Sequence, residues 1–155
     1  ESHRSKDMKK KFLLILTCAV MLNSCTPKEG IEIREAWMRP TAQGENGSVY
    51  FTLHNYSADD ELIGVSADIA RAAEIHESNM MDDVMQMRMV ESVPLVSGED
   101  VEFASGGLHV MLVGLKEEVK VGDMVDIVLH FKNSEDIHLQ VPVREGEEEH
   151  GGHGG

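Results

Sequence analysis

Residues 125–143 read VDIVLHFKNSEDIHLQVPV, and this stretch decides the fold class of the chain. Apolar residues occupy every second position on either side of a polar run at 132–136, which has the composition of a turn. Alternation with a period of two places the apolar side chains of a strand on one face. The stretch therefore predicts two adjacent antiparallel strands, whose inward residues are Val125, Ile127, Leu129, Phe131, Ile137, Leu139, Val141 and Val143.

The same alternation recurs toward the N-terminus, in Val49, Phe51 and Leu53 and again around 31–33. Glycine, asparagine and aspartate separate these short runs, and no segment has the periodicity of a long helix. We predict an all-β protein, either an antiparallel β-sandwich or a Greek-key barrel. Between the two ends of the chain lie roughly 110 residues, which suit one domain, at 33–144, around one core.

The N-terminal segment has the pattern of an export signal. Three lysines precede an apolar run, 12–22, that is too short to span a bilayer as a helix. The run ends in Leu-Asn-Ser-Cys, which resembles a bacterial lipobox with its cysteine at Cys25. We expect residues 1–24 to be a leader, made of upstream residues and a lipoprotein signal peptide, and residues 25–32 to be a tether lipidated at Cys25. The alternative is an ordinary secretory signal cut nearby. The mature protein would be an exported lipoprotein on the periplasmic or cell-surface side, attached to the membrane by its lipid alone.

Cysteine content and charge argue against two classes of protein. The two cysteines of the chain are Cys18, in the expected leader, and Cys25. The mature domain would therefore have neither a free thiol nor a disulfide. A blue-copper electron carrier needs a cysteine ligand, so that class is excluded. The net charge of −14 argues against nucleic acid as a partner, because its recognition requires basic patches.

Four residues have the types and spacing of a metal site. They follow the pattern His-x10-Met-x21-His-x-Met and are His76, Met87, His109 and Met111. Two imidazoles and two thioethers make a soft, neutral donor set, which favours one Cu(I) per domain over zinc, magnesium or calcium. His109 and Met111 are two residues apart, so both project from the same face of a strand. We expect His76 near the end of another strand, just before a loop at 78–83.

Other methionines surround the predicted ligands. We interpret Met85 and Met89 as packing residues, because methionine is a flexible filler of apolar cores. For Met80 and Met81 neither interpretation is favoured. The alternative to packing, for all four methionines, is a position around the ligands or a path by which copper enters.

Two further pairs of histidines are candidates for secondary sites. If Phe131 pairs with Ile137 across the turn, His130 faces His138 and the two imidazoles could chelate one metal, although two ordinary exposed histidines is the interpretation we favour. The tail at 145–155 is acidic, rich in glycine and histidine, and expected to be disordered. His150 and His153 could hold Cu(II) or zinc loosely there, or could be incidental to a solvated acidic tail.

The four-residue pattern resembles the defining motif of the PCuAC family of periplasmic copper chaperones. Segments 36–40 (AWMRP), 49–55 (VYFTLHN) and 106–115 (GGLHVMLVGL) are also similar to that family, whereas Ser105 and Leu108 depart from its usual proline and aromatic residue. The resemblance implies a cupredoxin-like barrel and a Cu(I) metallochaperone for respiratory oxidase assembly. It implies as acceptor the dinuclear copper centre of cytochrome c oxidase, in subunit II, or a thioredoxin-like assembly factor.

Two other functions stay open at this stage. The protein could sequester copper for resistance, with no acceptor, or it could be a metal-free β-sandwich that serves as an interaction module. We do not expect an enzyme, because the mature sequence has no cysteine nucleophile and no evident serine–histidine–carboxylate spacing. We expect a monomer.

Overall fold

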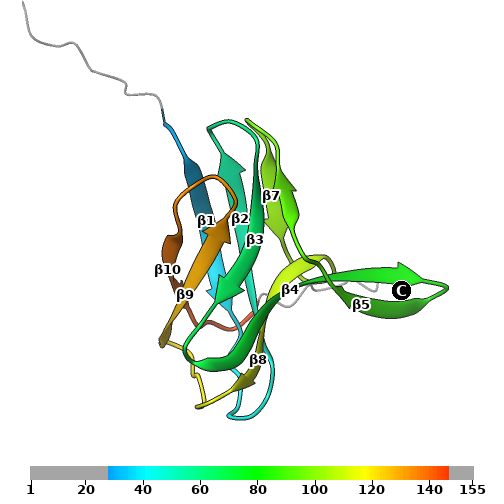
Figure 1. Cartoon of the computed structure of the whole chain (residues 1–155). Coiled ribbons are helices and arrows are strands. Elements are labelled where there is room, and N and C mark those ends of the chain that lie inside the picture. The colour runs from blue at the N-terminus through cyan, green and yellow to red at the C-terminus, as the bar shows by residue number, and fades with distance from the viewer. Residues whose placement is uncertain (1–27, 147–155) are drawn as a thin grey trace, which may run out of the picture.

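The computed structural model describes residues 28–146, and these fold into two β-sheets packed face to face (Figure 1). The expected leader, Cys25, His150 and His153 lie outside the described residues. Within the described part, every regular element is a strand, and no helix there is long and apolar enough to cross a membrane. The strands are β1 (Ile31–Met38), β2 (Gly47–Asn55), β3 (Asp60–Ser66), β4 (Ala70–Met81), β5 (Val84–Met89), β6 (Val93–Leu95), β7 (Asp100–Phe103), β8 (Leu108–Leu115), β9 (Met124–Phe131) and β10 (Ile137–Pro142).

The larger sheet has six strands in the order β1-β2-β7-β8-β4-β5, and the smaller has four in the order β10-β9-β3-β6. Strand β2 pairs with β8 through its first half and with β7 through its second half. All named strand pairs are antiparallel except β7 and β8, which meet in parallel through Phe103 and Leu108. The predicted all-β sandwich is confirmed.

Alternating residues from both sheets form the core, as the sequence predicts. Phe51 of β2 stacks on Phe103 of β7 with ring centroids 4.4 Å apart. Val110 and Leu112 of β8 are fully buried, so His109 and Met111 lie on the other, outer face of the same strand. The inward row of β9 is also buried, at Val125, Ile127, Leu129 and Phe131.

The predicted register of β9 and β10 is wrong. Ile137 pairs with Leu129 rather than with Phe131, and His138 therefore lies opposite Val128 and not opposite His130. The cause is a contact from another strand. Asp60 accepts hydrogen bonds from the backbone N–H groups at positions 133 and 134, both at 2.9 Å, which holds the connection in a longer loop than the polar run alone suggests.

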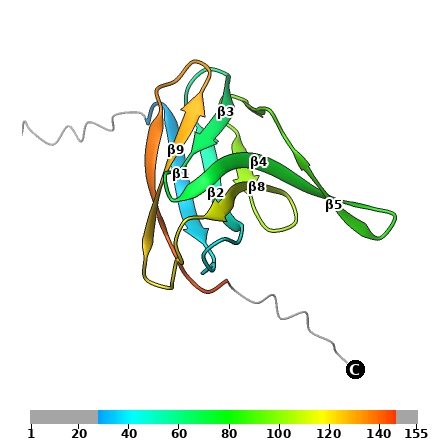
Figure 2. The same ribbon diagram turned by 60° about the horizontal axis from the view of Figure 1, so that its bottom comes forward.

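Strands β4 and β5 form a hairpin that continues beyond the sandwich. In both views it projects away from the two sheets (Figures 1 and 2). Asp82 and Asp83 join the strands, with φ of 51° and 62°. Positive φ at both central residues is what a two-residue type I′ hairpin turn requires. The loop predicted at 78–83 is therefore wrong, because strand pairing runs out to Met81 and Val84. We call residues 76–89 the arm.

Candidate metal centre

The two predicted histidine ligands are neighbours on paired strands. His76 of β4 lies directly opposite His109 of β8, and on its other side it lies opposite Met89 of β5. Directly opposite residues of antiparallel strands project to the same face of the sheet. His76, His109 and Met89 thus form one row across three strands, on the outer face.

The two predicted methionine ligands occupy the adjacent rows of that face. Met111 lies opposite Glu74, one row to one side, and Met87 lies opposite Ser78, one row to the other. Rows are two residues apart, or about 7 Å, which a methionine side chain can largely span. The structure therefore gathers the four predicted residues within three consecutive rows, although their role as ligands stays a prediction.

The two imidazoles are close together and withdrawn from water. Their ring centroids are 5.9 Å apart, and His109 is 4% exposed. Nδ1 of His76 and Nε2 of His109 are buried and have no hydrogen-bond partner in the protein. An unpaired buried polar atom costs about 1–3 kcal/mol, so it calls for an explanation. Metal–nitrogen bonds of about 2.0–2.1 Å would allow one ion to bind both rings at this separation.

The other nitrogen of each ring is held by an acceptor. Nε2 of His76 donates to a carboxylate oxygen of Glu74 at 2.7 Å, and Nδ1 of His109 donates to the backbone carbonyl of Gly107 at 3.1 Å. Ionised carboxylates and carbonyls only accept, so in the neutral form of each ring the proton lies on the nitrogen that makes this contact. The lone pairs are left on the two unpartnered nitrogens. Histidines that bind metals are typically oriented in this way.

The β5 side of the row is open to solvent. Met87 is 51% exposed and Met89 is 61% exposed, whereas Met111 is half-buried. The interpretation of Met85 and Met89 as packing residues is wrong, since Met85 is also exposed, at 55%. The physical reason is that the arm leaves the sandwich, so β5 has no second sheet to pack against.

Sequence reasoning missed two side chains of this face. Glu74 precedes His76 by two residues, so period-two alternation could have placed it beside the imidazole. Met89 could not be placed opposite His76 without knowing that the turn of the hairpin consists of two residues. The register of β4 with β5 places Met89 opposite His76, and the register of β4 with β8 places Glu74 opposite Met111.

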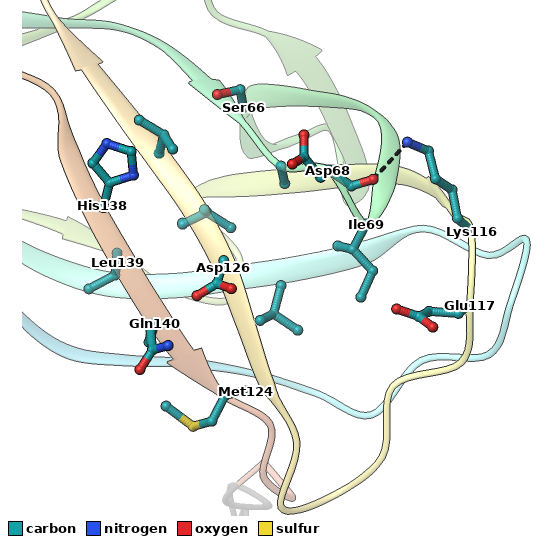
Figure 3. Close-up of a pocket in the computed structure, with 14 residues that line it drawn as sticks. Ser66, Asp68, Ile69, Lys116, Glu117, Met124, Asp126, His138, Leu139 and Gln140 are labelled. Carbon is teal, nitrogen blue, oxygen red and sulfur yellow. Dashed lines mark hydrogen bonds between the residues drawn. The ribbon is translucent and has the colours of Figure 1, made fainter.

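Other places in the described chain offer poorer sites. Within residues 28–146, no three histidine, cysteine, aspartate or glutamate side chains lie close enough together to hold a metal ion. Methionine is not among these four residue types. Figure 3 shows an open hollow beside β9 and β10, lined in part by Asp68, Lys116 and His138. Lys116 is engaged there by the backbone carbonyl of Asp68 at 2.7 Å. His138 lies on the smaller sheet, so the hollow adds no donor to the histidine row.

His130 is also occupied by other contacts. Its ring lies 2.9 Å from the hydroxyl of Ser66 and 2.9 Å from a carboxylate oxygen of Asp136. With the corrected register, the proposed pairing of His130 with His138 is removed.

Comparison with known proteins gives matches in sequence and in fold. A family model described as "Putative lipoprotein LpqE-like" matches residues 31–143. "Putative lipoprotein Lxx21020" of Leifsonia xyli subsp. xyli is 26% identical over 140 residues, which are 86% of this chain and 84% of that protein. "Uncharacterized protein RP573" of Rickettsia prowazekii is 32% identical over 115 residues, which are 70% of this chain and 64% of that protein.

Solved PCuAC domains have the same fold. "Apo PCuAC domain from PmoF1" matches with a TM-score of 0.63 and 23% identity, over 75% of this chain and 94% of that one. "Copper-bound PCuAC domain from PmoF2" matches with a TM-score of 0.62 and 24% identity, over 75% and 93%. The solution structure of CuI-DR1885 from Deinococcus radiodurans matches with a TM-score of 0.52 and 24% identity, over 79% and 81%. The cupredoxin-like fold that the sequence resemblance implies is confirmed.

Proposed function

The chain belongs to the LpqE-like family, and from that premise we propose that it is an exported Cu(I) chaperone. One Cu(I) would be bound on the outer face of the larger sheet. Its ligands would be His76, His109, Met87 and Met111.

The pair of buried, unpartnered imidazole nitrogens carries this proposal. Each nitrogen has its lone pair free, because Glu74 and Gly107 engage the opposite side of each ring. Thioethers lie in the rows on both sides, and thioether with imidazole is a donor set that suits Cu(I). Structural zinc sites prefer thiolate or more imidazole, and residues 28–146 contain no cysteine. Proteins of the same fold support the choice of metal, since one is described as copper-bound and another as the CuI form.

The geometry also suits release of the ion. His109 is buried, but Met87 stands on the open side of the site, where ligands of another protein can approach. A thioether is a neutral ligand, so an incoming thiolate or imidazole could replace it without separating a strong ion pair. A chaperone needs such a stepwise exchange.

We also propose where the protein acts and which protein receives its copper. Family and relative names that include "lipoprotein" support export and lipidation at Cys25, on the periplasmic or cell-surface side. The acceptor we propose is the dinuclear copper centre in subunit II of cytochrome c oxidase, with a thioredoxin-like assembly factor as the alternative recipient. The tail histidines His150 and His153 would be a separate, weak site for Cu(II) or zinc.

Anaerobic titration with Cu(I) against a competing chelator tests the site. The chain should bind one Cu(I) tightly, and His109→Ala should weaken that binding by orders of magnitude because it removes a buried donor. His138→Ala, at an exposed position on the other sheet, is the matched control and should change nothing. The same titration with His150→Ala and His153→Ala separates any contribution of the tail. Weak binding that His109→Ala leaves unchanged would instead favour a metal-free interaction module.

A transfer assay separates delivery from sequestration. The copper-loaded chain is mixed with the isolated copper-binding domain of oxidase subunit II, and loading of the dinuclear centre is followed by its absorption. Delivery predicts transfer that is faster than from an equal amount of chelator-bound copper. No transfer to subunit II or to a thioredoxin-like factor would favour sequestration.

A further inference from the structure

We propose that the arm carries a second, weaker Cu(I) site made of the thioethers of Met80, Met85 and Met87, which captures copper and passes it to the histidine row. The inference rests on the proposed function, because it assigns the route by which the tight site is loaded.

The arm has two chemically different faces. Met80 lies opposite Met85, Ser78 opposite Met87, and His76 opposite Met89, so one face presents four methionines in line with the histidine row. The other face presents Glu77 opposite Arg88, joined in an ion pair, and Met81 opposite Val84 near the turn. Thioether sulfur is thus concentrated on the face that leads to the proposed copper site.

Packing within the described chain does not account for these methionines. Met80 is 64% exposed and Met85 is 55% exposed. The two are paired next to the turn of the β4–β5 hairpin, which projects from the sandwich (Figure 2). A methionine that fills a core would be covered by a second layer, which the arm lacks.

The spacing suits one soft ion at the outer end. Cβ atoms of directly opposite residues are about 4.5–5.5 Å apart, so the sulfur atoms of Met80 and Met85 can meet at one ion. Met87 follows Met85 by two residues on the same face, about 7 Å along the strand, and its three rotatable bonds let it supply a third sulfur. Thioether ligands select Cu(I) over zinc, magnesium and calcium.

The same spacing gives a route to the histidines. Two steps of about 7 Å each along the strands separate the Met80–Met85 row from the His76–Met89 row. Met87 lies in the row between them. Met87 can therefore serve either site, though only one ion at a time, so the ion can exchange its ligands one by one. When the histidine row already holds an ion and Met87, the outer site keeps the sulfur atoms of Met80 and Met85. Only the inner site offers imidazole nitrogens as ligands. The affinity for Cu(I) should therefore increase from the outer site to the inner one.

Charge at the turn supports capture at the outer end. Asp82 and Asp83 are exposed at the turn, one and two residues beyond Met81. Two carboxylates at this position raise the local concentration of cations. Arg88, the cationic side chain of the arm, is on the other face and is paired with Glu77.

The test uses the full chain with isotope-labelled methionine methyl groups, titrated anaerobically with Cu(I) in acetonitrile and followed by NMR. The first equivalent should shift the methyl signals of Met87 and Met111. The second, weaker equivalent should shift those of Met80 and Met85. The double variant Met80→Leu/Met85→Leu keeps the volume of both side chains but removes the sulfur. It should lose the second equivalent, keep the affinity for the first, and take up the first several-fold more slowly from a chelator.

Met81→Leu is the matched control, because Met81 is an equally exposed methionine on the opposite face of the arm. It should behave as the unmodified chain does. A double variant that binds two equivalents and loads at the normal rate would overturn the inference, and so would a second equivalent that shifts only methyl groups outside the arm.

A further variant, His76→Ala/His109→Ala, separates this inference from the proposed function. Weak binding with shifts at Met80 and Met85 should persist there, because the outer site needs no imidazole. Tight binding in the unmodified chain without any shift at Met80 or Met85 would overturn the second site alone. Shifts at Met80 and Met85 without tight binding would overturn the proposed chaperone site and leave the outer thioether site standing.

Discussion

At the scale of single residues, Glu74 decides which nitrogen of His76 is free to bind copper. Its carboxylate accepts the Nε2 proton at 2.7 Å, so Nδ1 keeps its lone pair. Replacement by Ala should free the ring to rotate and to change tautomer. We expect Glu74→Ala to weaken Cu(I) binding by about 10–100-fold, the usual effect of losing such a partner, as measured by chelator competition.

Glu74→Gln and Glu77→Ala are the controls for this prediction. The glutamine keeps an acceptor oxygen and should recover most of the affinity. Glu77 faces the other side of β4 and pairs with Arg88, so its loss should not affect copper. Nitrogen-15 shifts of the imidazole should show Nε2–H for His76 in the unmodified chain and a mixture in Glu74→Ala. An unchanged tautomer together with unchanged affinity would show that Glu74 does not orient the ring.

A second residue, Asp60, stabilises the fold rather than the site. Burial acts to raise the pKa of its carboxyl, but hydrogen bonds from Ser134 and from the backbone N–H groups of Glu61, Asn133 and Ser134 outweigh that effect and hold the pKa below its ordinary value of 3.8. A lowered pKa means that the ionised form is favoured by folding. Its contribution to stability is therefore complete above pH 3.8 and is lost as the pH falls through the lower, folded-state pKa.

We expect Asp60→Asn to lower the free energy of unfolding by about 1–3 kcal/mol at pH 7, since it replaces a charged acceptor of several hydrogen bonds. Urea denaturation at pH 7 and at pH 3 measures the effect. The difference between the unmodified chain and the variant should shrink at pH 3, because the carboxyl of the unfolded chain is largely protonated below its ordinary pKa of 3.8. Asp126→Asn, on the exposed face of β9, is the control. Equal losses at both pH values would contradict the assignment.

At the scale of elements, the two residues at the turn of the arm are not the ones that suit its backbone conformation best. Asp82 and Asp83 both have positive φ, a conformation that asparagine and glycine adopt more readily. We expect Asp82→Asn/Asp83→Gly to stabilise the hairpin by about 1 kcal/mol. Slower amide hydrogen exchange in β5 would measure this, with a smaller effect for Asp82→Asn alone. Faster exchange would show that the two-residue turn is not the one used in solution.

Elements also show how far sequence reasoning reaches. The strands are predictable because a sheet with one buried face has apolar residues at every second position of each strand. The same alternation places Val110 and Leu112 inward and His109 outward. The β9–β10 register depends on Asp60, which lies more than seventy residues away in the chain. The sequence predicts a loop at 78–83 because the polar residues and methionines there, far from the core, carry no alternation signal. The ligand types and the position of Glu74 were therefore predictable, whereas the position of Met89 required the register of β4 with β5.

At the scale of the whole molecule, all donors proposed for Cu(I) come from one chain and one sheet face. Copper binding therefore requires no second copy, and we expect a monomer with and without Cu(I). Light scattering during size-exclusion chromatography measures this. A dimer that appears only with Cu(I) would mean that exposed thioethers of two arms share an ion, and Met80→Leu/Met85→Leu would then restore the monomer.

In the molecule as a whole, the packed core and the exposed path proposed for the ion lie in different places. The core of the sandwich lies between the two sheets, and the arm projects beyond them (Figure 1). The histidine row lies on the outer face of the larger sheet. Loading and release can therefore take place without opening the core. A chaperone with this arrangement should keep its fold when copper leaves.

X-ray absorption at the copper edge, recorded on the full chain loaded with one equivalent of Cu(I), tests the central claim most directly. The account predicts Cu(I) with two nitrogen and two sulfur neighbours, and the loss of one nitrogen in His109→Ala. A first shell of oxygen and nitrogen without sulfur, or a spectrum that His109→Ala leaves unchanged, would contradict it.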